Sequence, residues 1–200
     1  MAEICKTDLF ILRKIQHTGS NLIITGISPI YGKMSFYIRN AVTQKNNFHV
    51  FDLFRVVSVS YNDNGKDLLR PQSVDLKHDF SKIANHYERF QAGCRIAKFS
   101  LSNLPNGVGC PFYYRSLVVA FHRFAESELC LEAVLTGIAL TYLKESGWFG
   151  ESKLSVEEMA QCQLLIEMAA GGDIPALPLE NWQKLWEWAE HLLIDIECPL

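Results

Sequence analysis

The sequence lacks the motifs that proteins use to hold phosphates or to build hydrolytic sites. Its 200 residues contain no GxxxxGK(S/T), no GxGxxG, no GxSxG and no HExxH. These are the patterns of phosphate-binding loops, dinucleotide folds, serine hydrolases and zinc proteases. Acidic pairs such as Glu126 with Glu128 and Glu157 with Glu158 are more typical of solvated helix faces than of catalytic carboxylates. We therefore predict no catalytic residue and a protein that is not an enzyme.

Clustered cysteine and histidine are missing as well. The six cysteines stand singly, without a CxxC pair, and the six histidines are dispersed. Structural zinc sites need closely spaced Cys and His ligands, and disulfide-rich secreted domains are usually smaller than this chain. The pattern predicts free thiols in a reducing cytosol, no metal site and no cofactor.

A long apolar run is also absent. The best candidate, residues 129–143, is fifteen residues long and includes Glu132, whereas a membrane-spanning helix needs about 20 residues. The run Leu9–Leu12 is too short for the core of a signal peptide, and the basic pair Arg13-Lys14 follows it instead of preceding it. We expect a cytoplasmic protein with no membrane segment and no signal peptide.

Charge is divided unevenly along the chain, although the net charge is only −3. Residues 1–125 hold sixteen Lys and Arg against eight Asp and Glu, and residues 126–200 hold three against fourteen. Such asymmetry favours one part that faces a polyanion and a separate acidic part. The alternative is two solvated surfaces that differ without functional meaning.

The first 75 residues have the periodicity of β-structure. Lys33–Arg39 alternates apolar and polar residues, Gly26 suits a bulge or bend, and Pro71 indicates an edge strand. Five short strands separated by turns fit a small β-barrel of the size of an OB-fold. The expected strands are Thr7–Ile15, Asn21–Ser28, Lys33–Arg39, Phe48–Tyr61 and Leu68–Val74.

The rest of the chain has helical periodicity. The pattern predicts a helix from about Phe80 to Leu101, broken by the sequence Leu104-Pro105-Asn106-Gly107, and a capping box at Ser155 and Glu158. Further helices are expected over residues 112–124, 127–144, 155–170 and from 180 onward. The predicted fold class is therefore α+β, with a five-stranded OB-type barrel over residues 1–75 and an all-helical domain over residues 76–200.

Basic residues occur on nearly every expected strand or loop of the barrel, interleaved with aromatic residues. Single-strand binders combine cations along the backbone path with aromatic faces on which bases stack. Period two places Phe36 inside and Tyr37 outside. The predicted nucleic-acid-binding residues are Arg13, Lys14, Lys33, Tyr37, Arg39, Lys45, Arg55 and Arg70. The alternative is that these cations only keep the barrel soluble.

Several segments resemble the bacterial recombination mediator family RecO. The resemblance covers roughly residues 7–147 and is diffuse. It lacks the zinc element that many relatives carry, and it departs from the family's basic turn at Asn40. Its segments are Leu9–Leu12, Asn21–Thr25, Ile30-Tyr31-Gly32-Lys33, Arg39-Asn40-Ala41, Phe48–Arg55, Leu68-Leu69-Arg70, Val74–Phe80 and Ala84–Phe90.

The resemblance implies a non-catalytic mediator of DNA repair and homologous recombination. Such proteins bind single- and double-stranded DNA, anneal strands, contact single-strand-binding protein, and act with RecR to load recombinase on gapped DNA. It implies a nucleoid-associated protein with no small-molecule substrate. Four helical cations could extend the DNA surface or dock the acidic tail of a partner: Lys82, Arg89, Arg95 and Lys98. A protein-interaction adaptor that does not bind nucleic acid and an RNA-binding OB protein are the alternatives.

Overall fold

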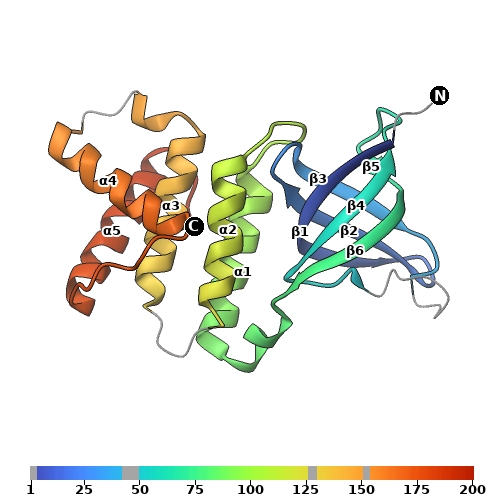
Figure 1. The fold of residues 1–200 in the computed structure, drawn as a ribbon, viewed down its shortest axis with the longest axis horizontal. Helices are drawn as coiled ribbons and strands as arrows, with labels where there is room; N and C mark the ends of the chain where they lie inside the picture. Colours follow the sequence, from blue (N-terminus) through green and yellow to red (C-terminus); the bar gives the residue numbers. More distant parts are fainter. Residues whose placement is uncertain (1–3, 42–49, 126–129, 151–153) are drawn as a thin grey trace. The chain divides into compact units, whose positions relative to one another are not determined.

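The computed structural model describes residues 4–41, 50–125, 130–150 and 154–200 (Figure 1). The chain divides into two compact units. The sheet unit comprises residues 1–82 together with 100–111, and the helical unit comprises residues 83–99 together with 112–200. The chain is thus α+β, with an N-terminal sheet followed by helices.

A curved six-stranded mixed sheet forms most of the sheet unit (Figure 1). Alternate side chains of its strands point inward and build one core, which includes Leu9, Ile24, Phe36 and Val57. The strand order is β5-β3-β2-β1-β4-β6. The strands are β1 (Ile4–His17), β2 (Asn21–Ser28), β3 (Gly32–Ile38), β4 (Arg55–Asn62), β5 (Leu68–Leu69) and β6 (Pro71–Asp79).

Three expectations about the sheet are wrong. The sheet has six strands in an open order, where a closed five-stranded barrel was predicted. The expected strand Leu68–Val74 is split at Arg70, because β5 pairs parallel with β3 whereas β6 pairs antiparallel with β4. Of the expected strand Phe48–Tyr61, Phe48 and His49 lie outside the described residues; in the described part the strand begins at Arg55, since Phe54 adopts a positive φ of 58° that an extended strand does not allow.

Gly26 lies opposite a β-bulge, as its place in the sequence suggested. Ile11 pairs with Gly26 and Arg13 pairs with Thr25, so Leu12 is an extra residue in β1. A Cβ at Gly26 would lie 2.3 Å from the carbonyl oxygen of Phe10. The close approach of the two backbones therefore requires glycine.

The loop that separates the first two helices packs on the sheet unit. Backbone N–H groups of Lys33, Gly107 and Cys110 donate to the carbonyl oxygens of Pro105, Tyr31 and Pro29 at 2.9–3.1 Å. The predicted helix break at residues 104–107 is confirmed. These hydrogen bonds explain why residues 100–111 belong to the sheet unit.

The helical unit is built around a helix that is buried on all sides. Every residue from Ala133 to Leu143 is buried in α3, and both α4 and α5 pack against it. Among the described residues, no helix is both long and apolar enough to cross a bilayer. The helices are α1 (Tyr87–Asn103), α2 (Pro111–Arg123), α3 (Leu131–Glu145), α4 (Val156–Ala169) and α5 (Leu179–Asp195).

The helix boundaries follow local signals with one exception. The capping box is confirmed, because the Ser155 hydroxyl accepts from the Glu158 backbone N–H and the Glu158 carboxylate accepts from the Ser155 backbone N–H. The first helix begins at Tyr87, not near Phe80, since Ser81–Asn85 forms a 3-10 turn. Tyr87, at the start of this helix, is exposed.

Candidate nucleic-acid interface

Three adjacent strands present an apolar row on the outer face of the sheet. Ile15 on β1 pairs with Ile23 on β2, which pairs with Tyr37 on β3. Residues paired in register lie on the same face of a sheet. Ile15 is 44% exposed and Ile23 and Tyr37 are half-buried, whereas Phe36, which points to the other face, is fully buried. We call Ile15, Ile23 and Tyr37 the platform.

A polar row runs beside the platform across the same three strands. Arg13 Nη2 donates to Thr25 Oγ1 at 3.4 Å, and the hydroxyls of Thr25 and Ser35 share a hydrogen bond of 3.1 Å. Arg13 itself is exposed. Its guanidinium is therefore held at the margin of the platform by a hydroxyl, with its charge accessible to an anion.

Side chains from two other segments meet Tyr37. The guanidinium of Arg70 lies 5.9 Å from the centre of the Tyr37 ring, and the His17 ring meets the tyrosine edge-on at 5.9 Å. Lys66 lies with these residues around a pocket of about 520 Å³. The lining of this platform pocket is His17, Tyr37, Asn64, Lys66, Leu68 and Arg70.

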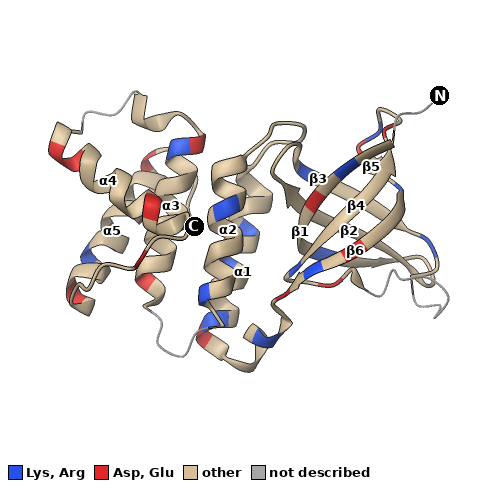
Figure 2. Ribbon diagram, viewed as in Figure 1, with Lys and Arg blue, Asp and Glu red and all other residues tan. Residues whose placement is uncertain are grey.

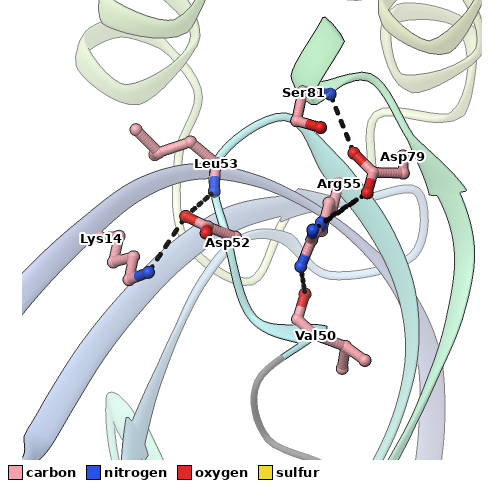
Figure 3. Close-up of polar contacts among 7 residues, drawn as sticks. All are labelled: Lys14, Val50, Asp52, Leu53, Arg55, Asp79 and Ser81. Atoms are coloured by element: carbon pink, nitrogen blue, oxygen red, sulfur yellow. Dashed lines mark hydrogen bonds and ion pairs between the residues drawn. The ribbon is translucent and has the colours of Figure 1, made fainter. Parts of the chain in front are cut away.

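Two predicted binding cations are instead neutralised by carboxylates (Figure 3). Lys14 Nζ lies 3.0 Å from Asp52 Oδ1, and Arg55 Nη2 lies 3.0 Å from Asp79 Oδ2. Although burial disfavours the charge of Asp79, hydrogen bonds from Ser81 and Arg55 outweigh it and hold the pKa of Asp79 below its ordinary value. Lys14 and Arg55 thus have anionic partners within the sheet unit.

Of the remaining residues predicted to bind nucleic acid, only some lie at the platform. Lys33 lies on the Tyr37 side of β3, but its Nζ donates to the Leu101 carbonyl oxygen at 2.9 Å. Arg39 directly follows β3 and is exposed. Lys45 lies outside the described residues. The structure therefore brings Arg13, Tyr37 and Arg70 to one face.

No family model matches this chain, and no curated protein matches its sequence. The function consequently has to be argued from the platform and its neighbours.

Sequence reasoning missed His17 and Lys66, which both line the platform pocket. His17 stands in the turn-like sequence His17-Thr18-Gly19-Ser20, and Lys66 follows the turn at Asn62–Gly65. The available signal was that OB-type barrels bind ligands with the loops between strands 1 and 2 and between strands 4 and 5. Applied to this sequence, that rule points to residues 17–20 and 63–67.

The four predicted partner-binding cations do not form one set. Lys82 belongs to the sheet unit, and the other three belong to the helical unit. Arg89 donates to the Phe124 carbonyl oxygen at 3.0 Å, while Arg95 pairs with Glu190 at 3.2 Å and lies 5.6 Å from the centre of the Trp186 ring. Arg89 and Arg95 therefore hold elements of their own unit together, whereas Lys98 is exposed.

Charge within the helical unit is separated by element (Figure 2). Lys and Arg predominate on α1 and α2, and Asp and Glu predominate on α4 and α5. Half of the fourteen acidic residues of 126–200 lie on α4 and α5, which pack against α3. Such acidic helices would repel a phosphate backbone.

Reactive or metal-binding groups are scarce in the part of the chain that the structure describes. That part contains no group of three or more His, Cys, Asp or Glu placed to hold a metal ion. Burial raises the pKa of the Cys94, Cys130 and Cys162 thiols, and a raised pKa favours the unreactive thiol over the thiolate. The platform is thus the best-supported functional site.

Proposed function

We propose that this chain is a RecO-like mediator of DNA repair and recombination whose sheet unit binds single-stranded DNA on the platform. The observation that carries the proposal is the grouping of Tyr37 with Arg70, His17 and Lys66 around one pocket. An aromatic ring beside several cations is the combination with which proteins stack a base and hold its phosphate.

The connectivity of the open sheet supports an OB-like fold. β1 pairs with both β2 and β4, β3 pairs parallel with β5, and only Arg70 separates β5 from β6 at the two ends of the strand order. The rings of Phe36 on β3 and Tyr61 on β4 lie 5.5 Å apart, although β1 and β2 separate these strands in the order. OB-type barrels bind oligonucleotides on strands 2 and 3 and the adjoining loops, which is where the platform lies.

The resemblance to RecO extends the proposal from binding to mediation. It supports binding of double-stranded DNA and annealing of strands, and it supports RecR and single-strand-binding protein as partners. Of the predicted cations in the helical unit, the exposed Lys98 best fits an acidic partner tail, because Arg89 and Arg95 already contact groups of that unit.

The proposal is tested by fluorescence anisotropy with a labelled oligo-dT at low salt. Stacking on an aromatic ring is worth about 1–3 kcal/mol per base, so Tyr37→Ala should weaken binding by about tenfold. Arg70→Gln should weaken it as well, since it removes a cation from the same pocket. The control is Lys14→Gln, which removes a charge already paired with Asp52 and should change the affinity by no more than about twofold.

Absence of binding to the unmodified protein would contradict the proposal. So would equal losses for Tyr37→Ala and Lys14→Gln, because the platform would then have no special role. Competition by RNA of the same sequence separates the DNA function from RNA binding. Stronger competition by RNA than by DNA would favour the RNA-binding alternative.

A further inference from the structure

A second hollow adjoins the platform pocket where β3 faces the loop between β4 and β5. It has a volume of about 520 Å³ and shares Lys66 and Leu68 with the platform pocket. We call it the slot, and its lining includes Tyr31, Tyr61, Asp63, Lys66, Asp67 and Leu68. A strand bound on the platform therefore has a continuous path into the slot.

The slot combines an aromatic wall with a size suited to a base. The rings of Tyr31 and Tyr61 meet edge-on at 6.4 Å. Tyr61 is only 2% exposed, so the half-buried Tyr31 is the ring that a base can reach. Burial and the neighbouring Tyr31 raise the pKa of Tyr61, so its hydroxyl stays neutral. Small-molecule sites occupy about 300–1,000 Å³ and are largely apolar with a few fixed polar groups, which matches this hollow.

One short loop supplies three of the four charged groups that line the slot, and the fourth, Lys33 of β3, donates to the Leu101 carbonyl oxygen. The Asp63 carboxylate accepts from the Gly65 backbone N–H at 2.9 Å, and the Asn64 side chain accepts from the Lys66 backbone N–H at 3.2 Å. These bonds order the loop that carries Asp63, Lys66 and Asp67. The loop thereby presents to the slot the ammonium group of Lys66 and the carboxylates of Asp63 and Asp67.

This set of groups matches one base better than the others. Lysine only donates hydrogen bonds, and an ionised carboxylate only accepts them. Guanine presents the acceptor O6 next to the donors N1–H and N2–H₂ on one edge. Thymine has a second acceptor where guanine has N2–H₂, and cytosine and adenine present ring-nitrogen acceptors to a carboxylate. A carboxylate facing an acceptor gains no hydrogen bond and is repelled.

We propose that the slot receives a base turned out of the bound single strand and selects guanine. Lys66 donates to O6, and the carboxylates of Asp67 and Asp63 accept from N1–H and N2–H₂. The inference rests on the proposed binding of single-stranded DNA by the platform. Phosphate contacts do not distinguish one base from another, so the slot would add a base preference to that binding.

The test compares oligo-dT with oligonucleotides of the same length that carry one central dG, dA or dC. Anisotropy should show about fivefold or tighter binding for the dG oligonucleotide, and no comparable gain for dA or dC. In Asp67→Asn the dG gain should fall below about twofold, while the affinity for oligo-dT stays unchanged. Asp63→Asn provides the second variant, and Asp75→Asn, an exposed carboxylate of β6 outside the slot, is the matched control.

The outcomes separate the two proposals. Equal affinity for all four oligonucleotides, with Tyr37→Ala still weakening oligo-dT, would overturn guanine selection and leave the platform intact. Failure of every oligonucleotide to bind would overturn both proposals. Retention of the full dG gain in both Asp67→Asn and Asp63→Asn would also overturn the assignment of the slot.

Discussion

At the scale of single residues, the nearest carboxylate decides which cations of the sheet unit remain available to a ligand. Lys14 and Arg55 face Asp52 and Asp79, and Lys77 lies 2.7 Å from Asp8. Surface ion pairs of this kind contribute only about 0–1 kcal/mol to stability. Their effect on binding is larger than their effect on folding, because a phosphate has to compete with the carboxylate for the same cation.

The Arg55–Asp79 pair makes a small, pH-dependent contribution to stability. The pKa of Asp79 is lowered in the folded protein, so its stabilisation is present above the ordinary Asp pKa of about 3.9 and is lost as the pH falls through the lower folded value. We expect Asp79→Asn to lower the free energy of unfolding at pH 7 by at most about 1 kcal/mol. Near pH 2 the variant and the unmodified protein should differ much less.

Urea denaturation followed by circular dichroism at the two pH values measures this difference. Asp75→Asn on the same strand serves as the control and should have little effect at either pH. An Asp79→Asn deficit that grows as the pH falls would contradict the assigned direction of the pKa shift.

At the scale of elements, the long strand β1 links the two halves of the sheet by pairing with β2 at one end and β4 at the other. The bulge at Leu12 lies where this change of partner occurs, since Phe10 pairs with both Ile27 and Val56. Bulges bend a strand and increase its twist. The bend orients the distal part of β1, which carries Arg13, Ile15 and His17 to the platform.

Gly26→Ala should strongly destabilise this bend. The added methyl group would lie 2.3 Å from the Phe10 carbonyl oxygen and 2.9 Å from the Leu9 side chain. Overpacking of this kind costs about 1–3 kcal/mol or more, and we expect a loss near the upper end. Gly150→Ala is the control, because a Cβ there meets nothing within 4 Å. Thermal unfolding of both variants measures the difference, and equal melting temperatures would disprove the close approach.

At the scale of the whole molecule, some of the cations counted in the sequence are held in ion pairs, and others remain available to a ligand. The sheet unit carries Arg13, Lys66 and Arg70 at or near the platform, and the exposed Arg39 directly follows β3. In the helical unit, seven of the fourteen acidic residues of 126–200 lie on α4 and α5. A basic excess counted from the sequence therefore overstates the number of phosphates that the chain can neutralise.

The salt dependence of DNA binding should reflect this smaller number. Neutralising about four phosphates of a single strand predicts a slope near −3 for log K against log salt, since each contact contributes about −0.7. Affinity should therefore fall as salt rises. Anisotropy titrations at several salt concentrations measure the slope, and Lys14→Gln should leave it unchanged whereas Arg70→Gln should make it shallower. A slope near zero would contradict binding through phosphates.

Local pattern was sufficient for much of the secondary structure. Alternation in residues 33–39 predicted β3 with Phe36 inside, the signals at Ser155 and Glu158 predicted the start of α4, and Gly26 indicated the bulge. The first two features depend on residues close in the chain or on one strand, whereas Gly26 marks a close approach to Phe10 of β1. The family resemblance remains a prediction, because no family model matches.

Tertiary structure decided which residues make the candidate site. Arg70 reaches Tyr37 because β5 pairs with β3, and Lys14 is ion-paired because residues 50–54 bring Asp52 beside it. Both contacts join segments far apart in the sequence, whose meeting depends on strand register and loop path. Composition reports how many cations a chain has, but their availability depends on which carboxylates and carbonyl groups the fold places next to them.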